Sequence, residues 1–158
     1  MSRFFRRGKS KAYWVVTLGS LTSPSAAQIN SGVNMTQQIA DISGFEFSNS
    51  PIATPDLSTT FTTTIPGEDT AQEPQLVFYE DDTVNTLQST LAKGTTGHVV
   101  LFYKGTAGAN PAAADKCEVW KVISTGPYRE YSMGNDPARW GARFTPTDPP
   151  TFDATCAA

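Results

Sequence analysis

The sequence predicts a mainly β protein, a β-sandwich or barrel of about seven or eight short strands with one flanking α-helix and an extended arm at each end. Several short segments alternate between apolar and polar residues, with the period of two that is typical of half-buried strands. One segment, near residues 83–92, has apolar residues at helical spacing. Prolines and glycines separate the segments, as in antiparallel sheets joined by turns.

Length and composition predict one domain over residues 1–158. We expect an N-terminal arm (1–12), a β-sandwich with its helix (13–144) and a C-terminal arm (145–158). The chain is 39% hydrophobic but only 17% charged, below the roughly 25% of an average soluble domain. A surface so poor in charge indicates that part of it is covered by a partner.

Positive charge is concentrated at the N-terminus. Five of the twelve basic residues lie in the first eleven positions, which contain no acidic residue, so the other 147 residues hold seven basic and fifteen acidic groups, a net charge of −8. The segment has the outline of a weak signal peptide, but we interpret it as an arm, with Phe4 and Phe5 as apolar anchors, that docks on the acidic surface of a sibling subunit. Nucleic-acid contact is the alternative, which the acidic body disfavours.

The first elements after the arm are expected as follows. Residues 13–18 form a strand, and residues 24–29 form a helical turn that begins with a proline. Residues 39–47 alternate as far as Gly44, where the break predicts a β-bulge. Residues 49–56 contain two prolines and are expected to form a loop.

The central segment contains the predicted helix. Residues 57–65 carry their larger side chains at odd positions and predict a half-buried strand. Residues 76–79 are a second short strand, and in the helix Val84, Leu87 and Leu91 form an apolar stripe that packs on the sheet. Gly94 would end this helix.

The last third of the chain predicts three strands and two connections. Residues 99–103 are apolar throughout, which indicates a strand covered on one face by the core and on the other by the helix or a neighbouring subunit. Residues 105–115 are expected to form an exposed connection, and residues 118–124 the next strand. Residues 126–137 are rich in turn residues, and residues 138–144 alternate strictly as a strand.

Acidic residues gather in the middle of the sequence. Six of them lie between positions 68 and 82: Glu68, Asp69, Glu73, Glu80, Asp81 and Asp82. A solvated loop and helix start would explain them, and the functional alternative is an acidic surface that meets a basic one.

No catalytic, cofactor-binding or metal site is expected. His98 is the only histidine, and the pair Asp81-Asp82 supplies few oxygen ligands for a cation. Cys117 and Cys156 fit no metal spacing, and free thiols are favoured over a disulfide. A carbohydrate- or receptor-binding module would need exposed aromatic residues, whereas Trp140 lies on the apolar side of its strand.

The order and spacing of four segments resemble a known family. ATPDLSTTFTTTIPG, LVFYEDDTVNTLQSTL and KGTTGHVVLFYKG, preceded by INSGVNMTQQIADISGFEFSNSPIATPD, are similar to the major tail protein, or tail tube protein, of long-tailed bacteriophages, in the version common among phages of actinobacteria. The resemblance covers about half to two thirds of the chain. It lies in the series of segments, since no single motif is diagnostic.

The resemblance implies a non-enzymatic virion protein, made in the host cytoplasm, whose β-sandwich subunits form six-membered rings that stack into the tail tube. Its partners would be itself, other tail proteins at the tube ends and DNA passing through a predominantly acidic lumen. One sheet would join those of its neighbours into a barrel, and a long loop (66–75) and the two arms would reach the next ring. The candidate ring contacts are Phe4, Phe5, Arg6, Arg7, Glu68, Asp69 and Glu73.

Two alternatives remain open from sequence alone. A tail terminator or decoration protein would form single rings or isolated units. A β-sandwich carbohydrate- or receptor-binding module would present its aromatic residues in a groove.

Overall fold

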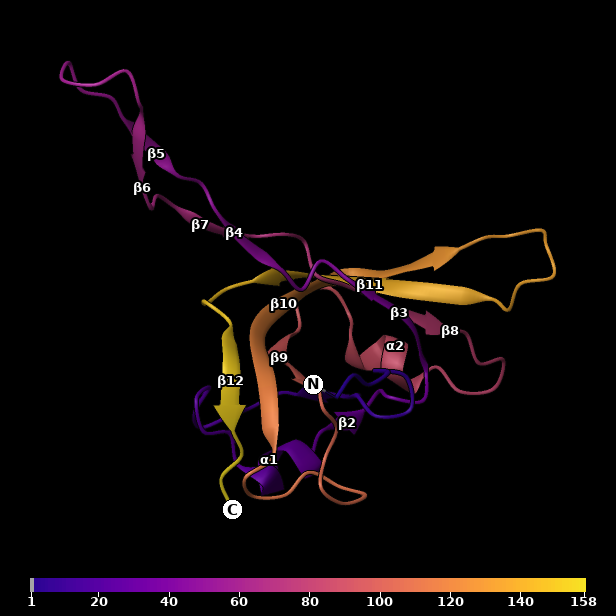
Figure 1. Ribbon diagram of the computed structural model, residues 1–158. Helices are drawn as coiled ribbons and strands as arrows, with labels where there is room; N and C mark the ends of the chain where they lie inside the picture. Colours follow the sequence, from indigo (N-terminus) through magenta and orange to yellow (C-terminus); the bar gives the residue numbers. More distant parts are fainter. Residues whose placement is uncertain (1) are drawn as a thin grey trace.

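A computed structural model describes residues 2–158 (Figure 1). Eight strands form one antiparallel sheet: β1 (Lys11–Val15), β2 (Val33–Asn34), β3 (Ile39–Ser43), β8 (Gln75–Tyr79), β9 (Thr96–Phe102), β10 (Lys116–Glu130), β11 (Arg139–Pro146) and β12 (Thr151–Thr155). Four short strands form a separate ribbon: β4 (Phe47–Asn49), β5 (Ile52–Thr54), β6 (Thr63–Ile65) and β7 (Asp69–Ala71). The helices are α1 (Ala26–Asn30) and α2 (Thr86–Thr90). The predicted mainly β class is therefore confirmed.

The sheet folds over on itself because its longest strand bends. The order is β2-β1-β9-β10-β11-β8-β3, with β12 also paired to β10. The start of β10 pairs with β9 and its end with β11, and the register shifts between Ser124 and Gly126. Gly126 has a φ of +113°, which side-chain-bearing residues rarely adopt, so the strand can turn there. The bend separates a first layer (β2, β1, β9, the start of β10, β12) from a second layer (the end of β10, β11, β8, β3), as Figure 1 shows.

The main core lies between these two layers. Trp14 of the first layer stacks on Phe144 of the second, with ring centroids 5.7 Å apart. Phe78 and Trp140 stack beside them at 4.6 Å, and Leu91 at the end of α2 is fully buried against the same cluster. Burying side chains of this size contributes roughly 1.5 to 3 kcal/mol each.

A second core covers the outer face of the first layer. Ile29 of α1 and Ala154 of β12 belong to one buried cluster with Val100 and Val119. Strand β9 is thus buried on both faces, as predicted, because Val99 points into the main core and Val100 into this one. Both covers belong to this chain, so β9 needs no neighbouring subunit.

Residues 47–71 form a ribbon that stands away from the body and is the largest departure from prediction (Figure 1). Only Thr63–Ile65 of the predicted strand 57–65 is a strand, and Leu57 is 109% exposed. Residues 49–56, predicted to be a loop, contribute β5. Alternation of threonines with apolar residues suits an exposed two-stranded ribbon as well as a half-buried strand. The pattern alone therefore did not show that no other part of the subunit packs against this segment.

The helix is shorter than predicted, and two of the three residues of its predicted apolar stripe are buried. Helix α2 has five residues. The Oδ1 atom of Asp81 accepts the backbone N–H groups of Thr83 and Val84, and this turn delays the helix start. Val84 is consequently 55% exposed, whereas Leu87 and Leu91 are buried.

Three further boundaries differ from prediction. Strand β10 continues to Glu130 through the segment expected to be turns. The register irregularity of β3 falls between Ile39 and Asp41, while Gly44, with a φ of +75°, follows the end of that strand. The C-terminal residues 145–158 are extended as expected, but β12 pairs with β10 of the same subunit.

Candidate functional site

The projecting ribbon, residues 47–71, presents apolar side chains that its own chain does not cover. Two antiparallel strand pairs build it, β4 with β7 and β5 with β6. The side-chain amide of Asn49 donates to the Asp69 carboxylate at 2.7 Å within the β4–β7 pair, and to the Gly67 carbonyl at 2.8 Å in the link between β6 and β7. The large apolar residues exposed along it are Phe47, Ile52, Leu57, Phe61 and Ile65. Several exposed apolar side chains on one projecting segment are typical of an interaction surface.

A chain of aromatic rings holds the root of the ribbon. Phe47 stacks on Phe152 of β12 at 5.0 Å between ring centroids, and Phe152 meets Trp120 edge-on at 6.5 Å. Phe45, just before the ribbon, packs edge-on against Trp120 at 5.4 Å. Because Trp120 is fully buried in the main core, the direction of the ribbon is tied to the body.

The N-terminal arm is held by its own subunit over most of its length. A turn closes when the N–H of Lys9 donates to the Arg6 carbonyl at 3.0 Å. The Ser10 hydroxyl donates to the Tyr103 carbonyl at 3.0 Å, and the Lys11 ammonium binds the loop after β9. Residues 2–5 have no such contacts among the hydrogen bonds of the described residues, and Phe5 is 88% exposed.

A groove, here called the arm groove, runs between this folded arm and strand β3. Arg6, Arg7 and Lys9 line the arm side of it. Its apolar lining includes Ile39, Phe45 and Leu101, which are partly buried and pack against the main core.

Glu118 contributes a half-buried carboxylate to the arm groove. It accepts the indole N–H of Trp120. Burial raises the pKa of Glu118, and the Trp120 hydrogen bond and the nearby Arg6 offset this in part. The groove therefore carries a carboxylate whose charge is costly to keep in the folded protein.

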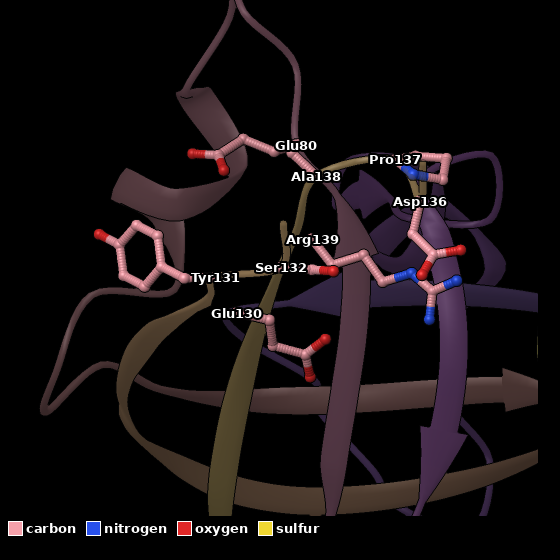
Figure 2. A pocket seen from close by; sticks show the side chains of 8 residues that line it. All are labelled: Glu80, Glu130, Tyr131, Ser132, Asp136, Pro137, Ala138 and Arg139. Carbon is pink, nitrogen blue, oxygen red and sulfur yellow. The ribbon is translucent and has the colours of Figure 1, made fainter. Parts of the chain in front are cut away.

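The hairpin that joins β10 to β11 extends beyond the sheet (Figure 1). Near its tip, Tyr131 is 91% exposed and Met133 is 106% exposed. Glu80, Glu130, Asp136 and Arg139 line a shallow hollow at its root, and the Tyr131 ring points away from Arg139 (Figure 2).

The same hairpin is anchored toward α2. The Arg129 guanidinium donates to Glu80 at 2.9 Å and to Gln88 at 3.2 Å. The exposed tip thus extends from a base that is fixed by side-chain contacts to Glu80 and α2.

The second layer ends in two strand edges without a partner. Strand β3 pairs only with β8, and residues 126–130 of β10 pair only with β11, in the part of the chain that the structure describes. Pro127 removes one backbone donor from the latter edge. Exposed edges of this kind are templates for pairing with another chain.

The outer face of the second layer carries arginines laid over tyrosines. Arg143 lies 4.8 Å from the ring centroid of Tyr128, and Arg139 lies 5.7 Å from that of Tyr79. A Cβ atom on Gly141 would lie 2.4 Å from the Tyr128 ring. Only glycine therefore lets this ring lie against the strand.

The predicted contact residues do not form one cluster. Arg6 and Arg7 border the arm groove, whereas Glu68, Asp69 and Glu73 are exposed on the returning side of the ribbon and beyond it. Between residues 2 and 158, no salt bridge joins the two groups. The sequence analysis identified neither the arm groove nor the hairpin tip. The tip could have been recognised from Tyr131 and Met133, two large side chains in a polar segment rich in turn residues.

The histidine and the two cysteines considered as candidate chemical groups are buried in the fold. His98 is buried, its Nδ1 lies 3.2 Å from the Val15 carbonyl oxygen, and burial lowers its pKa. Cys117 and Cys156 are buried free thiols, as predicted, with their sulfurs 4.0 Å apart. Residues 2–158 contain no group of three or more side chains arranged to hold a metal ion. None of their helices has the length and apolar character to span a membrane.

One comparison with known proteins identifies a family, and another finds a similar fold. A family model described as "Phage tail tube protein" matches residues 1–158. No curated protein matches the chain. A chain from the solved structure titled "Cryo-EM structure of the anti-feeding prophage (AFP) baseplate, 6-fold symmetrised" is similar in fold, with a TM-score of 0.64 and 9% sequence identity over 96% of this chain and 98% of that one.

Proposed function

The chain belongs to the phage tail tube protein family, and we propose that it assembles into closed rings through the two free edges of its second layer, and that these rings stack into the tail tube. The family gives it a structural role in the phage tail. Six-membered rings, their stacking and the conduit for genome ejection are parts of the proposal.

One observation carries the ring proposal: the second layer has an even number of strands, all antiparallel. In the order β3-β8-β11-β10, each pair is antiparallel. The two edge strands therefore run in opposite directions. When copies are related by rotation about an axis, β3 of one copy meets the end of β10 of the next in an antiparallel pair, and the contact repeats until the ring closes.

The chemistry of these edges is compatible with such pairing. Strand β3 has five residues, and after Pro127 the next residue of β10 with the same backbone orientation, Arg129, retains its N–H donor. The resulting ladder is short, so side-chain contacts have to add to it. The solved neighbour belongs to a structure with six-fold symmetry by its title, which supports six as the ring size.

The outer face of the second layer would line the lumen in this arrangement. On that face, Asp41 and Glu130 are offset by Arg139 and Arg143. The tyrosines beneath the arginines hold the positive groups close to the wall. This part of the proposed lumen is balanced in charge, in contrast to the acidic wall that the resemblance implies.

Stacking between rings is assigned to the projecting ribbon and to the exposed start of the arm. The ribbon extends from the body with its apolar groups uncovered. Phe4 and Phe5 would add apolar contacts, and Glu68, Asp69 and Glu73 would add charge. The C-terminal residues have a smaller role than the resemblance implies, because β12 belongs to the sheet of its own subunit.

A second candidate is a ring protein that begins or ends a tube. The solved neighbour comes from a baseplate, which favours this possibility. The projecting ribbon favours stacking, because a single ring would leave its apolar surface exposed to water.

Electron microscopy of the purified protein at high concentration and moderate salt tests both candidates. Hollow tubes of uniform width, with the second-layer sheets continuous from subunit to subunit in a cryo-EM map, are the expected result. Tubes whose subunits meet through the first layer would contradict the edge pairing. Single rings that do not stack at any concentration would favour the second candidate.

A further inference from the structure

We propose that the hairpin tip, residues 131–137, of one copy fills the arm groove of the next copy in the same ring. The inference rests on the edge pairing proposed above. It names the side-chain contact that reinforces the short backbone ladder, and it assigns Arg6 and Arg7 to a contact within the ring.

The strand register brings the tip to the groove. In the register of the second layer, Ile39 of β3 lies opposite Phe78 of β8, Phe78 opposite Trp140 of β11, and Trp140 opposite Arg129 of β10. These four residues therefore lie at the same level across the sheet. In an arrangement whose second-layer strands run along the ring axis, rotation keeps these levels the same, and the neighbour's β10 reaches its last residues beside Ile39. The neighbour's hairpin then continues past β3, where Ile39 borders the arm groove.

The apolar groups on the two sides match. Tyr131 and Met133 are almost wholly exposed in the single subunit, and both extend from a hairpin whose base is held by the Arg129–Glu80 ion pair. The arm groove offers Ile39 and Leu101, which are only partly covered, whereas Phe45 lies beyond the other end of β3. A tyrosine provides a large contact area at small entropic cost, and methionine adapts to an irregular groove.

Charge complementarity is confined to the arm side of the groove. The segment from residue 130 to residue 138 carries Glu130 and Asp136 and no basic residue. Arg6, Arg7 and Lys9 line the arm side of the groove, whereas Asp41, Glu46 and Glu118 also line it. Attraction between an acidic tip and a basic border would orient the hairpin as it enters.

Cross-linking between engineered cysteines tests the contact. Ile39→Cys and Met133→Cys are combined in one chain, assembled into tubes and treated with a short bismaleimide. The native Cys117 and Cys156 are buried. The unsubstituted protein, treated in the same way, measures any cross-linking through these two thiols. We expect covalent oligomers up to the size of the ring, formed in tubes and not in dissociated subunits.

A matched pair, Ile39→Cys with Phe61→Cys, places the second thiol on the ribbon tip. Tubes in which the 39/61 pair cross-links and the 39/133 pair does not would overturn the inference, because the ribbon would then occupy the groove. Tubes in which neither pair cross-links would overturn it as well, while leaving the proposed function intact. Wild-type protein that forms neither rings nor tubes would remove the proposed function and this inference together.

A substitution at the tip gives an independent readout. Met133→Asp should weaken association of subunits by about tenfold or more, and Met133→Leu should restore it. Both variants should melt like the wild-type subunit, since the Met133 side chain is fully exposed in the single subunit. Unchanged assembly of Met133→Asp would contradict the inference.

Discussion

Phe47 and Phe152 stack with their ring centroids 5.0 Å apart and an angle of 30° between the ring planes. Phe47 begins the projecting ribbon and Phe152 lies in β12. Through Trp120, the pair connects the ribbon to the main core. The position of the C-terminal strand β12 therefore helps to set the direction in which the ribbon, the proposed stacking surface, projects.

Replacement of Phe152 by alanine should release the ribbon while the body stays folded. Phe152 is 43% exposed, so we expect a loss of about 1 kcal/mol from the stacked pair. Limited proteolysis should cleave residues 47–71 faster than in the wild type, and tubes should form less readily. Phe61→Ala, at the exposed ribbon tip, is the control that should leave the proteolysis rate unchanged. Equal cleavage rates in Phe152→Ala and wild type would show that other contacts hold the ribbon.

Leu91→Ala should destabilise the subunit by about 2 to 5 kcal/mol, because it leaves a cavity between α2 and the two layers. Val84→Ala, on the exposed side of the helix start, should change stability by less than about 0.5 kcal/mol. Urea denaturation followed by circular dichroism measures both values. Similar losses for the two variants would contradict the assigned helix face.

Glu118 should make the subunit less stable as pH rises. Its pKa is raised above the ordinary value of 4.5 by burial, so the folded state binds a proton more readily than the unfolded state. The resulting stabilisation is complete below pH 4.5 and is lost as pH rises through the folded pKa. Glu118→Gln keeps an acceptor for the Trp120 indole and should remove this loss, which solvent screening limits to a few tenths of a kcal/mol. If the free energies of unfolding of wild type and Glu118→Gln changed in parallel between pH 4 and about 7, the predicted loss of stability with rising pH would be contradicted.

Removal of residues 2–5 should leave folding intact and impair stacking. The hydrogen bonds that hold the arm begin at Arg6, so the melting temperature should change by less than about 2 °C. Fewer and shorter tubes are expected by electron microscopy, with rings still present. Normal tube length in this truncation would exclude Phe4 and Phe5 as stacking contacts.

The sequence predicted the parts of the fold that depend on local patterns. Alternation identified the strand that contains Trp140, because the side-chain period of a strand is local. The stripe of Leu87 and Leu91 likewise showed the buried face of α2. The helix length was wrong because Asp81 forms a turn that competes with the helix.

Features that depend on distant parts of the chain were not predicted. The arm groove brings together Arg6, Phe45 and Leu101, which no spacing in the sequence connects. The C-terminal segment 145–158 was predicted to be extended, but the pairing of β12 with β10 was not predicted. The projecting ribbon was missed for a related reason, since alternation cannot show whether a body lies beneath a strand.

Amide hydrogen exchange in assembled tubes tests the central claim, the pairing of β3 with the end of β10 of the next subunit, most directly. Peptides that cover Ile39–Ser43 and residues 128–130 are compared between dissociated subunits and tubes, with the edge strand Val33–Asn34 as the reference. The account predicts that exchange slows at both second-layer edges on assembly and changes less at the reference strand. Tubes in which exchange at both second-layer edges is as fast as in free subunits would contradict it.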